Sequence, residues 1–154
     1  MKLKVKKLRP DAVVPKYGTE GASGFDFVAV EDTLILTGQT ELVKTGLAMA
    51  IDQGYELQVR PRSGMSLKTP LRVSNAPGTV DSDFRGEICV IMTNTSRPFQ
   101  KDDGTYDSGA YLIKKGDRIA QGVICPIVQV EFDEVDDLDD TVRGLGAFGS
   151  TGTN

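Results

Sequence analysis

Apolar and polar residues alternate along several short stretches of the chain, and this alternation is its strongest structural signal. Residues Tyr55–Arg60 show it most clearly, since Tyr55, Leu57 and Val59 fall on one face of an extended strand and polar side chains on the other. The pattern predicts an all-β protein. The other expected strands are Lys2–Leu8, Phe25–Val30, Thr33–Leu36, Glu41–Ile51, Glu87–Thr93, Ala110–Ile113 and Arg118–Glu131.

Glycine, proline and aspartate gather between these stretches, as tight connections require. Only residues 63–68 and the acidic residues 131–142 could form helices, both short. Many short, regularly spaced strands predict a sandwich or barrel of mostly antiparallel strands, of the jelly-roll type. Residues 97–108 are polar, and we expect a loop or a hairpin there.

The length of 154 residues fits one domain with a substantial core. The apolar runs are too short to span a membrane, and the first eight residues alternate instead of forming a signal-peptide core. We therefore expect no membrane partner and a cytoplasmic location (host cytoplasm if the source is a virus). Cys89 and Cys125 lie in apolar runs, which favours buried, unreactive thiols over a disulfide.

Charge and the absence of histidine narrow the possible chemistry. Without histidine there is no Ser-His or Cys-His couple, no His-ligated metal and no imidazole base. Residues 131–140 hold seven of the 22 acidic residues and no basic one, so the rest of the chain is slightly basic. Basic residues cluster only in residues 2–7, which does not suit nucleic-acid binding. Catalysis must use carboxylates, hydroxyls, arginines or a cation bound by oxygen.

Two short segments combine charge with backbone freedom near strand ends. Asp26 follows a glycine and stands between two phenylalanines, a position that also suits a strand-edge hydrogen bond. Arg62, Ser63 and Gly64 follow the strand that ends near Arg60. A Ser/Gly turn beside a guanidinium suits a di- or triphosphate, and a helix N-cap with a surface arginine fits these residues equally well.

Two further segments lie later in the chain. Residues 75–86 are the densest cluster, with Asp81 on an expected hairpin between glycines and Phe84 three residues on. The same residues could be an ordinary hairpin with turn aspartates and a core phenylalanine. Residues 116–121 end in Gln121, and on their own they suit a turn that leads into a buried strand.

The fifth segment is the C-terminal tail, residues 143–152. Four glycines in ten residues and no apolar period exclude a regular element. The remaining residues include an arginine for phosphate, a phenylalanine for a base, and hydroxyls. A frayed terminus is the alternative, and composition alone favours it.

In this order and spacing, the five segments resemble the five motifs of the homotrimeric dUTPase family, from about Ala22 to Gly152. Five ordered motifs are far more specific than one glycine-rich loop. The resemblance implies a jelly-roll domain, residues 1–142, and a mobile lid, residues 143–154. It also implies a homotrimer with shared active sites that hydrolyses dUTP to dUMP and pyrophosphate with Mg²⁺, limiting uracil in DNA and supplying dUMP for dTTP synthesis.

The resemblance also implies a role for each site residue. Asp81 would hold the 3′-hydroxyl and act as general base on the attacking water, and Phe84 would lie under the deoxyribose and exclude a 2′-hydroxyl. Asp26 would help place Mg²⁺ through a metal-bound water, with the substrate phosphates holding most of the ion. The phosphate contacts would be Arg62, Ser63, Gly64 and, from a neighbouring subunit, Gln121. The uracil contacts would be Asn75, Gly78, Thr79 and Val80. The tail contacts would be Arg143, Phe148, Gly149, Ser150 and Thr151, with Phe148 stacked on uracil.

Three departures from the family pattern stand out. Phe84 replaces the usual tyrosine, which removes one hydroxyl and predicts a modest loss of affinity. Ala147 replaces a usual glycine, and closure of the tail costs about 1 kcal/mol more if that residue needs a positive φ. Residues 97–108 are longer than the common family connection.

Other readings remain. A dCTP deaminase or a bifunctional relative shares the fold but uses a glutamate to activate water, whereas Asp81 occupies the motif-three position. A dUTPase-fold regulatory protein could use residues 97–108 as a binding surface. A purely structural β-sandwich leaves the five motifs unexplained.

Overall fold

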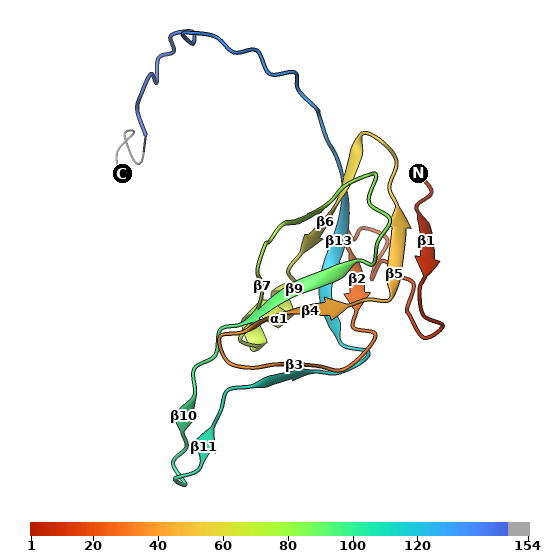
Figure 1. The fold of residues 1–154 in the computed structure, drawn as a ribbon, viewed down its shortest axis with the longest axis vertical. Helices are drawn as coiled ribbons and strands as arrows, with labels where there is room; N and C mark the ends of the chain where they lie inside the picture. Colours follow the sequence, from red (N-terminus) through yellow and green to blue (C-terminus); the bar gives the residue numbers. More distant parts are fainter. Residues whose placement is uncertain (148–154) are drawn as a thin grey trace.

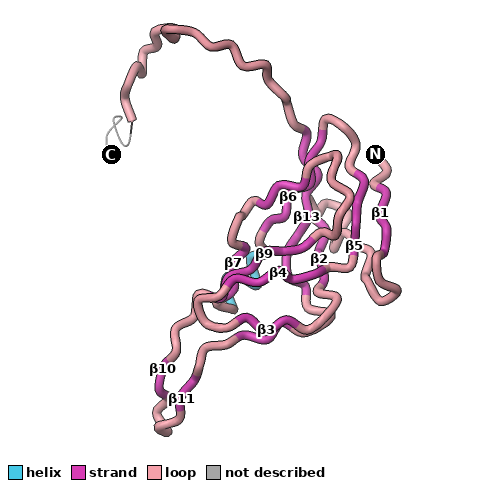
Figure 2. Tube along the Cα trace, viewed as in Figure 1, coloured by secondary structure: helices cyan, strands magenta, loops and turns pink. Residues whose placement is uncertain are grey.

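The computed structural model describes residues 1–147. The expected substrate contacts of the tail lie outside the described residues, namely Phe148, Gly149, Ser150 and Thr151. Within residues 1–147 the chain forms thirteen strands and one short helix, α1 (Ser63–Lys68). Loops and strands accordingly dominate Figure 2. The prediction of an all-β fold with a helix at residues 63–68 is confirmed.

A four-stranded antiparallel sheet carries most of the residues that the motifs single out. Its order is β2 (Phe25–Val28), β13 (Arg118–Pro126), β6 (Tyr55–Arg60) and β8 (Gly78–Val80). On β6, Leu57 and Val59 are buried, as the alternation predicts. On the outer face of this sheet, Asp26, Gln58, Arg60 and Gln121 are half-buried.

The other strands form one three-stranded and three two-stranded sheets. The larger has the order β4 (Thr40–Lys44), β9 (Cys89–Asn94), β7 (Leu71–Val73). The hydrogen-bonded orders of the described sheets are open, so no closed barrel forms within residues 1–147. The two-stranded sheets pair β1 (Lys4–Lys7) with β5 (Leu47–Ala50), β3 (Thr33–Ile35) with β12 (Tyr111–Ile113), and β10 (Phe99–Gln100) with β11 (Tyr106–Asp107).

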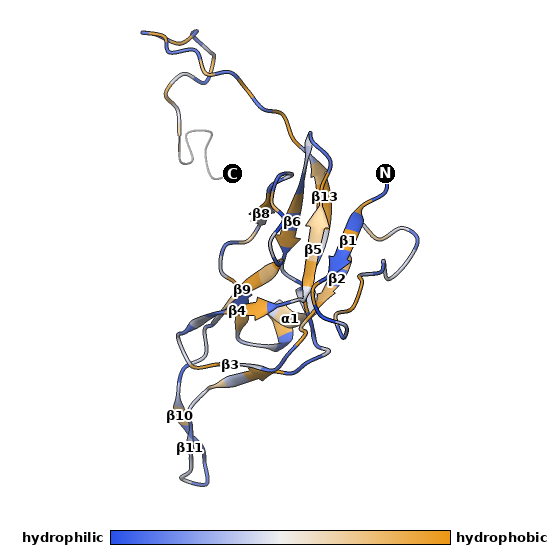
Figure 3. Ribbon diagram, turned by 45° about the vertical axis from the view of Figure 1, so that its right-hand side comes forward, coloured by the Kyte–Doolittle hydropathy of each residue, from blue (hydrophilic) through white to orange (hydrophobic). Residues whose placement is uncertain are grey.

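The core lies between the sheets and is apolar, as the orange inner strands of Figure 3 show. Phe27, Leu57 and Val90 are among its fully buried side chains. The buried amide of Asn94 donates from Nδ2 to the carbonyl of Ile35 at 3.0 Å, so it is satisfied. The sheets are thereby fixed against one another.

Several expected element boundaries were wrong. The single strand expected over Glu41–Ile51 is two strands, because Gly46 lies between them with a φ of 70° that turns the chain. The strand expected over Arg118–Glu131 ends at Pro126. The strands β7 and β8 were not anticipated, since three residues are too few to show a period.

The acidic residues 131–142 form no helix, which corrects that expectation. They continue the chain beyond β13 as an arm that leaves the body (Figure 1). Like charges three and four residues apart repel on a helix surface, and this segment has no basic residue to offset them. We call residues 127–147, which follow β13, the arm. The arm exposes the apolar side chains of Val128, Val130 and Phe132.

Residues 97–108 form a hairpin, one of the two forms expected for them. Strands β10 and β11 pair in antiparallel register and project away from the body (Figure 1). Cys89 and Cys125 are free thiols and only half-buried, so the expectation of full burial was wrong. Among residues 1–147, no helix has the length and apolar character needed to cross a membrane.

Candidate active site

Asp26 accepts hydrogen bonds from two arginines. Arg62 Nε donates to Asp26 Oδ1 at 2.7 Å, and Arg118 Nη1 donates to Asp26 Oδ2 at 3.1 Å. Arg62 Nη1 also donates to the carbonyl of Arg118, at 3.2 Å. Two guanidinium groups against one carboxylate leave this cluster positive, which suits an anionic ligand.

Local structure explains where Arg62 lies. Pro61 follows the last residue of β6, and a proline cannot continue the hydrogen-bonded ladder. The helix α1 begins at Ser63, and Arg62 is its N-cap residue but makes no side-chain capping bond. The alternative of a helix N-cap with a surface arginine holds only in part: the N-cap lies at Arg62, but its side chain is 23% exposed and paired with Asp26. Ser63 and Gly64 lie exposed beside it.

Gln121 lies next to this cluster. On β13 it pairs in register with Asp26 on one side and Arg60 on the other. Its Nε2 donates to the carbonyl of Pro61 at 2.9 Å. A Cβ on Gly24 would lie 2.7 Å from Gln121 Oε1, so a side chain there would displace the amide. The structure thus brings together Asp26, Arg62 and Gln121 from three expected motifs.

A second group of expected site residues lines a cavity of about 340 Å³. Every residue of the third motif to which the sequence assigns a role contributes to it. These residues are Asn75, Gly78, Thr79, Val80, Asp81 and Phe84. The cavity has an apolar wall that the sequence did not reveal, formed by Leu42, Val59, Ile88, Cys89 and Ile91. A nucleobase, which is flat and mostly apolar with a few polar groups at its edges, suits such a cavity.

Asp81 directly follows β8, at the start of a turn. The amide of Phe84 donates to the carbonyl of Asp81 at 3.2 Å, which closes the turn. Arg85 Nη1 donates to the carbonyls of Ser82 and Phe84 at 2.6 and 2.8 Å, so its side chain braces the turn from outside. The expected hairpin with a paired second strand is not formed, because β8 pairs only with β6 among the described strands.

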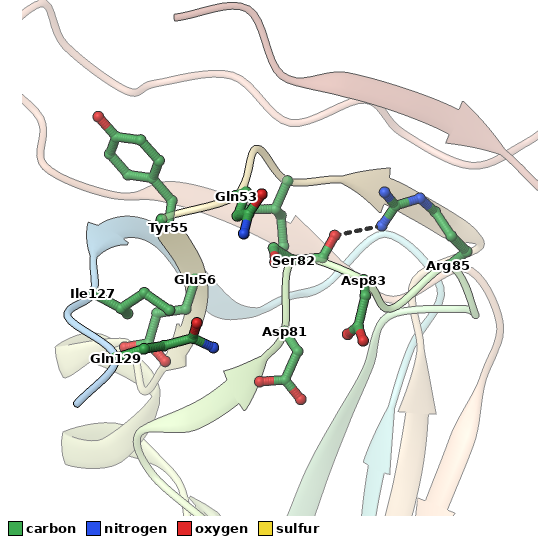
Figure 4. A pocket seen from close by; sticks show the side chains of 11 residues that line it. Gln53, Tyr55, Glu56, Asp81, Ser82, Asp83, Arg85, Ile127 and Gln129 are labelled. Carbon is green, nitrogen blue, oxygen red and sulfur yellow. Dashed lines mark hydrogen bonds between the residues drawn. The ribbon is translucent and has the colours of Figure 1, made fainter. Parts of the chain in front are cut away.

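The Asp81 carboxylate is exposed and borders two cavities. Besides the apolar cavity, it lines a more polar one of about 690 Å³ (Figure 4). Tyr55, Glu56 and Gln129 also line this second cavity. A carboxylate with solvent on one side and a ligand cavity on the other can accept a proton from a water at their boundary.

The sequence missed Arg118 and Glu87. Arg118 lies within the fourth segment but was given no role, and the local pattern held no signal for it, because an irregularity in the pairing of β13 with β2 lies between Arg118 and Ala120. Glu87 Oε1 accepts from the amide of Gly46 at 2.8 Å and lines the apolar cavity. Burial raises the pKa of the neighbouring Cys89 thiol, and the charge of Glu87 adds to this. Cys89 therefore contributes a neutral thiol to the wall.

The described part of the tail does not reach either cluster within its own chain. Arg143 is exposed on the arm, and its Nε donates to the carbonyl of Gly146 at 2.8 Å. The predicted contact between Arg143 and a phosphate can therefore form only if the arm takes a different path or if the phosphate is bound by another subunit.

The two clusters of site residues lie on one sheet but far apart. Asp26 pairs with Gln121, and Gln121 pairs with Arg60, so Asp26 lies level with the end of β6 at Arg60. Asp81 follows Val80, which pairs with Leu57, so Asp81 lies level with the opposite end of β6. From strand spacing and rise, Asp26 and Asp81 of one chain are about 20 Å apart.

The fold and the two clusters are those of an all-β protein built to bind a compact ligand beside an acidic group. A dUTPase family model matches residues 11–152, and the chain belongs to this family of enzymes. The chain is 51% identical over 152 residues to the deoxyuridine 5′-triphosphate nucleotidohydrolase of Nautilia profundicola, covering 99% of each protein.

Two solved structures of phage proteins are also similar. The Staphylococcus bacteriophage 80alpha dUTPase with dUPNHPP has a TM-score of 0.88 at 28% identity, with 99% of each chain covered. A mutant dUTPase from phage phi11 of S. aureus, which coordinates a structural Mg(II) ion, has a TM-score of 0.77 at 26% identity. That match covers 89% of this chain and 98% of the phage chain.

Proposed function

We propose that the chain hydrolyses dUTP to dUMP and pyrophosphate by attack of water at the α-phosphorus, in a Mg²⁺-dependent reaction. In the cell it limits uracil incorporation into DNA and supplies dUMP for dTTP synthesis, and it acts in the cytoplasm. The observation that carries the proposal is the position of Asp81, an exposed carboxylate at the edge of the cavity lined by Asn75 and Phe84.

The apolar cavity takes the nucleoside. Asn75 and the backbone around Gly78–Val80 read the uracil edge, and Phe84 packs under the deoxyribose. Asp81 holds the 3′-hydroxyl and orients the water for in-line attack. Its carboxylate accepts the proton of that water as the new P–O bond forms and the bond to pyrophosphate breaks.

The arginine cluster takes the phosphates. Two bonds occupy Arg62 Nε and Nη1, and Nη2 makes no hydrogen bond within residues 1–147. A guanidinium anchored on Asp26 presents its remaining N–H groups in a fixed direction, which suits phosphoryl oxygens. Ser63, Gly64 and Gln121 add neutral donors beside it.

The residues around Asp26 fit a Mg²⁺ ion that is held mainly by the substrate. Both Asp26 oxygens already accept from arginines, so its remaining lone pairs suit a metal-bound water better than the ion itself. No group of three His, Cys, Asp or Glu side chains in residues 1–147 could hold a metal. When bound, the ion neutralises charge on the phosphates. The phage phi11 relative coordinates a structural Mg(II) ion, which supports Mg²⁺ binding within the family but not its position at Asp26.

The separation of about 20 Å between Asp26 and Asp81, which combines three strand spacings with an offset of four residues along the strands, supports a shared active site. A water aligned by Asp81 and a phosphate held near Asp26 must lie within a few ångströms of each other, which one chain does not achieve. A neighbouring copy can bring its own arginine cluster to the Asp81 cavity. We therefore propose a homotrimer in which the two clusters of each site come from different subunits.

The arm supports assembly independently. Val128, Val130 and Phe132 are 88%, 63% and 92% exposed, and they recur at every second position. An extended segment with one apolar face and no strand partner among residues 1–147 of its own chain buries that face against another copy. The arm then also carries Arg143 and the tail towards a site on a neighbouring subunit.

The test is pyrophosphate release from each dNTP and from UTP, with Mg²⁺ and with EDTA. We expect turnover of dUTP alone, abolished by EDTA. With dUTP in ¹⁸O-labelled water, attack at the α-phosphorus puts the label in dUMP, and label in pyrophosphate contradicts the mechanism. Ammonia release from dCTP would indicate the deaminase instead.

A further inference from the structure

The ring of Phe84 lies over Gly86. A Cβ built on Gly86 would be 2.6 Å from Cζ, 3.0 Å from Cε2 and 3.4 Å from Cε1 of that ring. Real carbon atoms in contact lie about 3.5–4.0 Å apart. The outer end of the ring therefore occupies the space that any side chain at position 86 would take.

The backbone at Gly86 does not itself require glycine. Its φ lies outside the left-handed region, unlike that of Gly46 at 70° or Gly116 at 94°. An L-residue here would not meet the strain of a left-handed φ. The three atoms nearest to a side chain at position 86 all belong to the Phe84 ring, so this ring is the first obstacle to a substitution.

The rest of Phe84 is also fixed. Its amide closes the turn with Asp81, and its carbonyl accepts from Arg85 at 2.8 Å. The side chain is nevertheless 44% exposed, so part of the ring is uncovered while its outer end rests on Gly86. The ring also lines the apolar cavity.

We infer that Gly86 is a positioning residue for substrate selection: by lacking a side chain, it leaves room for the outer end of the Phe84 ring, which lines the nucleoside cavity. This inference rests on the proposed placement of Phe84 under the deoxyribose. Substitution of Gly86 moves the ring end by about 1 Å, and the ring then no longer fits the sugar. Gly86 touches no reacting atom, so binding and selectivity change while the proton transfer does not.

The test is Gly86→Ala in the full chain. We expect the KM for dUTP and the Kd for dUPNHPP to rise about tenfold, as for one lost aromatic contact. The preference for dUTP over UTP, as a ratio of kcat/KM values, should fall, and kcat should stay within about twofold because Asp81 is not displaced.

A double-mutant cycle with Phe84→Ala separates positioning from a general structural effect. Without the ring, Gly86→Ala should cause no further change, so the double variant should match Phe84→Ala. Gly18→Ala is the matched control, because a Cβ at Gly18 meets no atom within 4 Å and its φ is also ordinary. Its kinetic constants should equal those of the wild type.

Additive effects in the cycle, or wild-type selectivity in Gly86→Ala, overturn the inference. If Gly86→Ala fails to fold, the melting curve of the double variant with Phe84→Ala answers the question: recovery of folding without the ring supports the clash, and no recovery overturns the inference. Failure of the proposed function looks different: the wild type itself would not hydrolyse dUTP, whereas failure of this inference leaves wild-type turnover intact.

Discussion

Arg62 and Asp26, 36 positions apart in the sequence, are joined by a hydrogen bond of 2.7 Å between Nε and Oδ1. Both side chains are partly buried, at 23% and 29% exposure. A bond through Nε fixes the plane of the guanidinium as well as its position, because the group is rigid and planar. The direction in which Arg62 can bind an anion is therefore set by Asp26.

Replacing Arg62 with lysine should test this relationship. Lysine keeps the charge but loses the planar fork, so kcat/KM for dUTP should fall about tenfold to a hundredfold through loss of phosphate alignment. Steady-state kinetics measure it. Arg72→Lys is the control, since Arg72 lies on β7 and bonds only to the carbonyls of Thr69 and Leu71 among residues 1–147. Equal losses in both variants would argue against a role of Arg62 in alignment.

Asp81→Asn should leave binding within a few-fold of wild type and lower kcat by about two orders of magnitude or more. The amide has the shape of the carboxylate but cannot accept the proton of the attacking water. Single-turnover kinetics and calorimetric binding of dUPNHPP measure the two effects. Asp83→Asn, two residues on and exposed, is the matched control. Near-normal turnover in Asp81→Asn would remove this residue from the role of base.

Light scattering should give a mass of about three times the 16.6 kDa chain. The double substitution Val130→Asp with Phe132→Asp should shift this towards monomer and lower activity in parallel, because charge on the apolar face of the arm opposes its burial. Phe132→Leu keeps that face apolar and should remain trimeric. A fully active wild-type monomer would contradict the shared site.

Deleting residues 143–154 should leave the melting temperature and the trimer almost unchanged while activity falls by orders of magnitude. Residues 143–147 contribute nothing to the core. We expect the tail to supply a phosphate contact from Arg143 and a base contact from Phe148. The single change Phe148→Ala should be milder, since stacking of a base on an aromatic ring is worth about 1–3 kcal/mol. Removal of residues 153–154 alone is the control, and a truncated enzyme with wild-type rate would make the tail a frayed end.

Acid should weaken the attachment of the N-terminal segment. Lys115 and then Arg9 hydrogen-bond to Asp11 and lower its pKa from 3.8 to about 2. A carboxyl group with a lowered pKa in the folded state stabilises the fold fully above 3.8, and this contribution is lost as the pH falls towards 2. Asp11→Asn should flatten the dependence of melting temperature on pH in that window.

Asp52→Asn is the control for that experiment, because Asp52 forms no ion pair within residues 1–147. It should follow the wild-type profile. An unchanged profile in Asp11→Asn would show that the pairs with Arg9 and Lys115 contribute nothing measurable, as is common for exposed ion pairs.

The sequence by itself determined the class of fold and most of the candidate site. Strict alternation over Tyr55–Arg60 predicts a strand with one buried face, because side chains of an extended chain point to opposite sides in turn. Arg62 was identifiable because a guanidinium beside a Ser/Gly turn suits phosphates, whereas Asp26 and Asp81 became candidates through the resemblance of the five ordered segments to the dUTPase motifs. The all-β architecture and the family followed from such local patterns.

Only the tertiary structure decided which of these residues meet. Hydrogen bonding between strands remote in sequence brings Asp26, Arg62 and Arg118 together, and no local pattern encodes that register. The same register holds Asp81 far from Asp26, which sequence order did not reveal.

The conformation of the arm and the role of Gly86 were likewise decided only by the tertiary structure. Composition left residues 131–142 open to a helix, but unpaired charge in an arm without a packing partner among residues 1–147 gives extended chain. From the sequence, Gly86 had no role beyond flanking the expected Asp81 hairpin, whereas in the structure the Phe84 ring fills the space that a side chain at Gly86 would take. The preference of a segment for helix, strand or turn depends on neighbouring residues, whereas a contact between two side chains depends on the path of the whole chain.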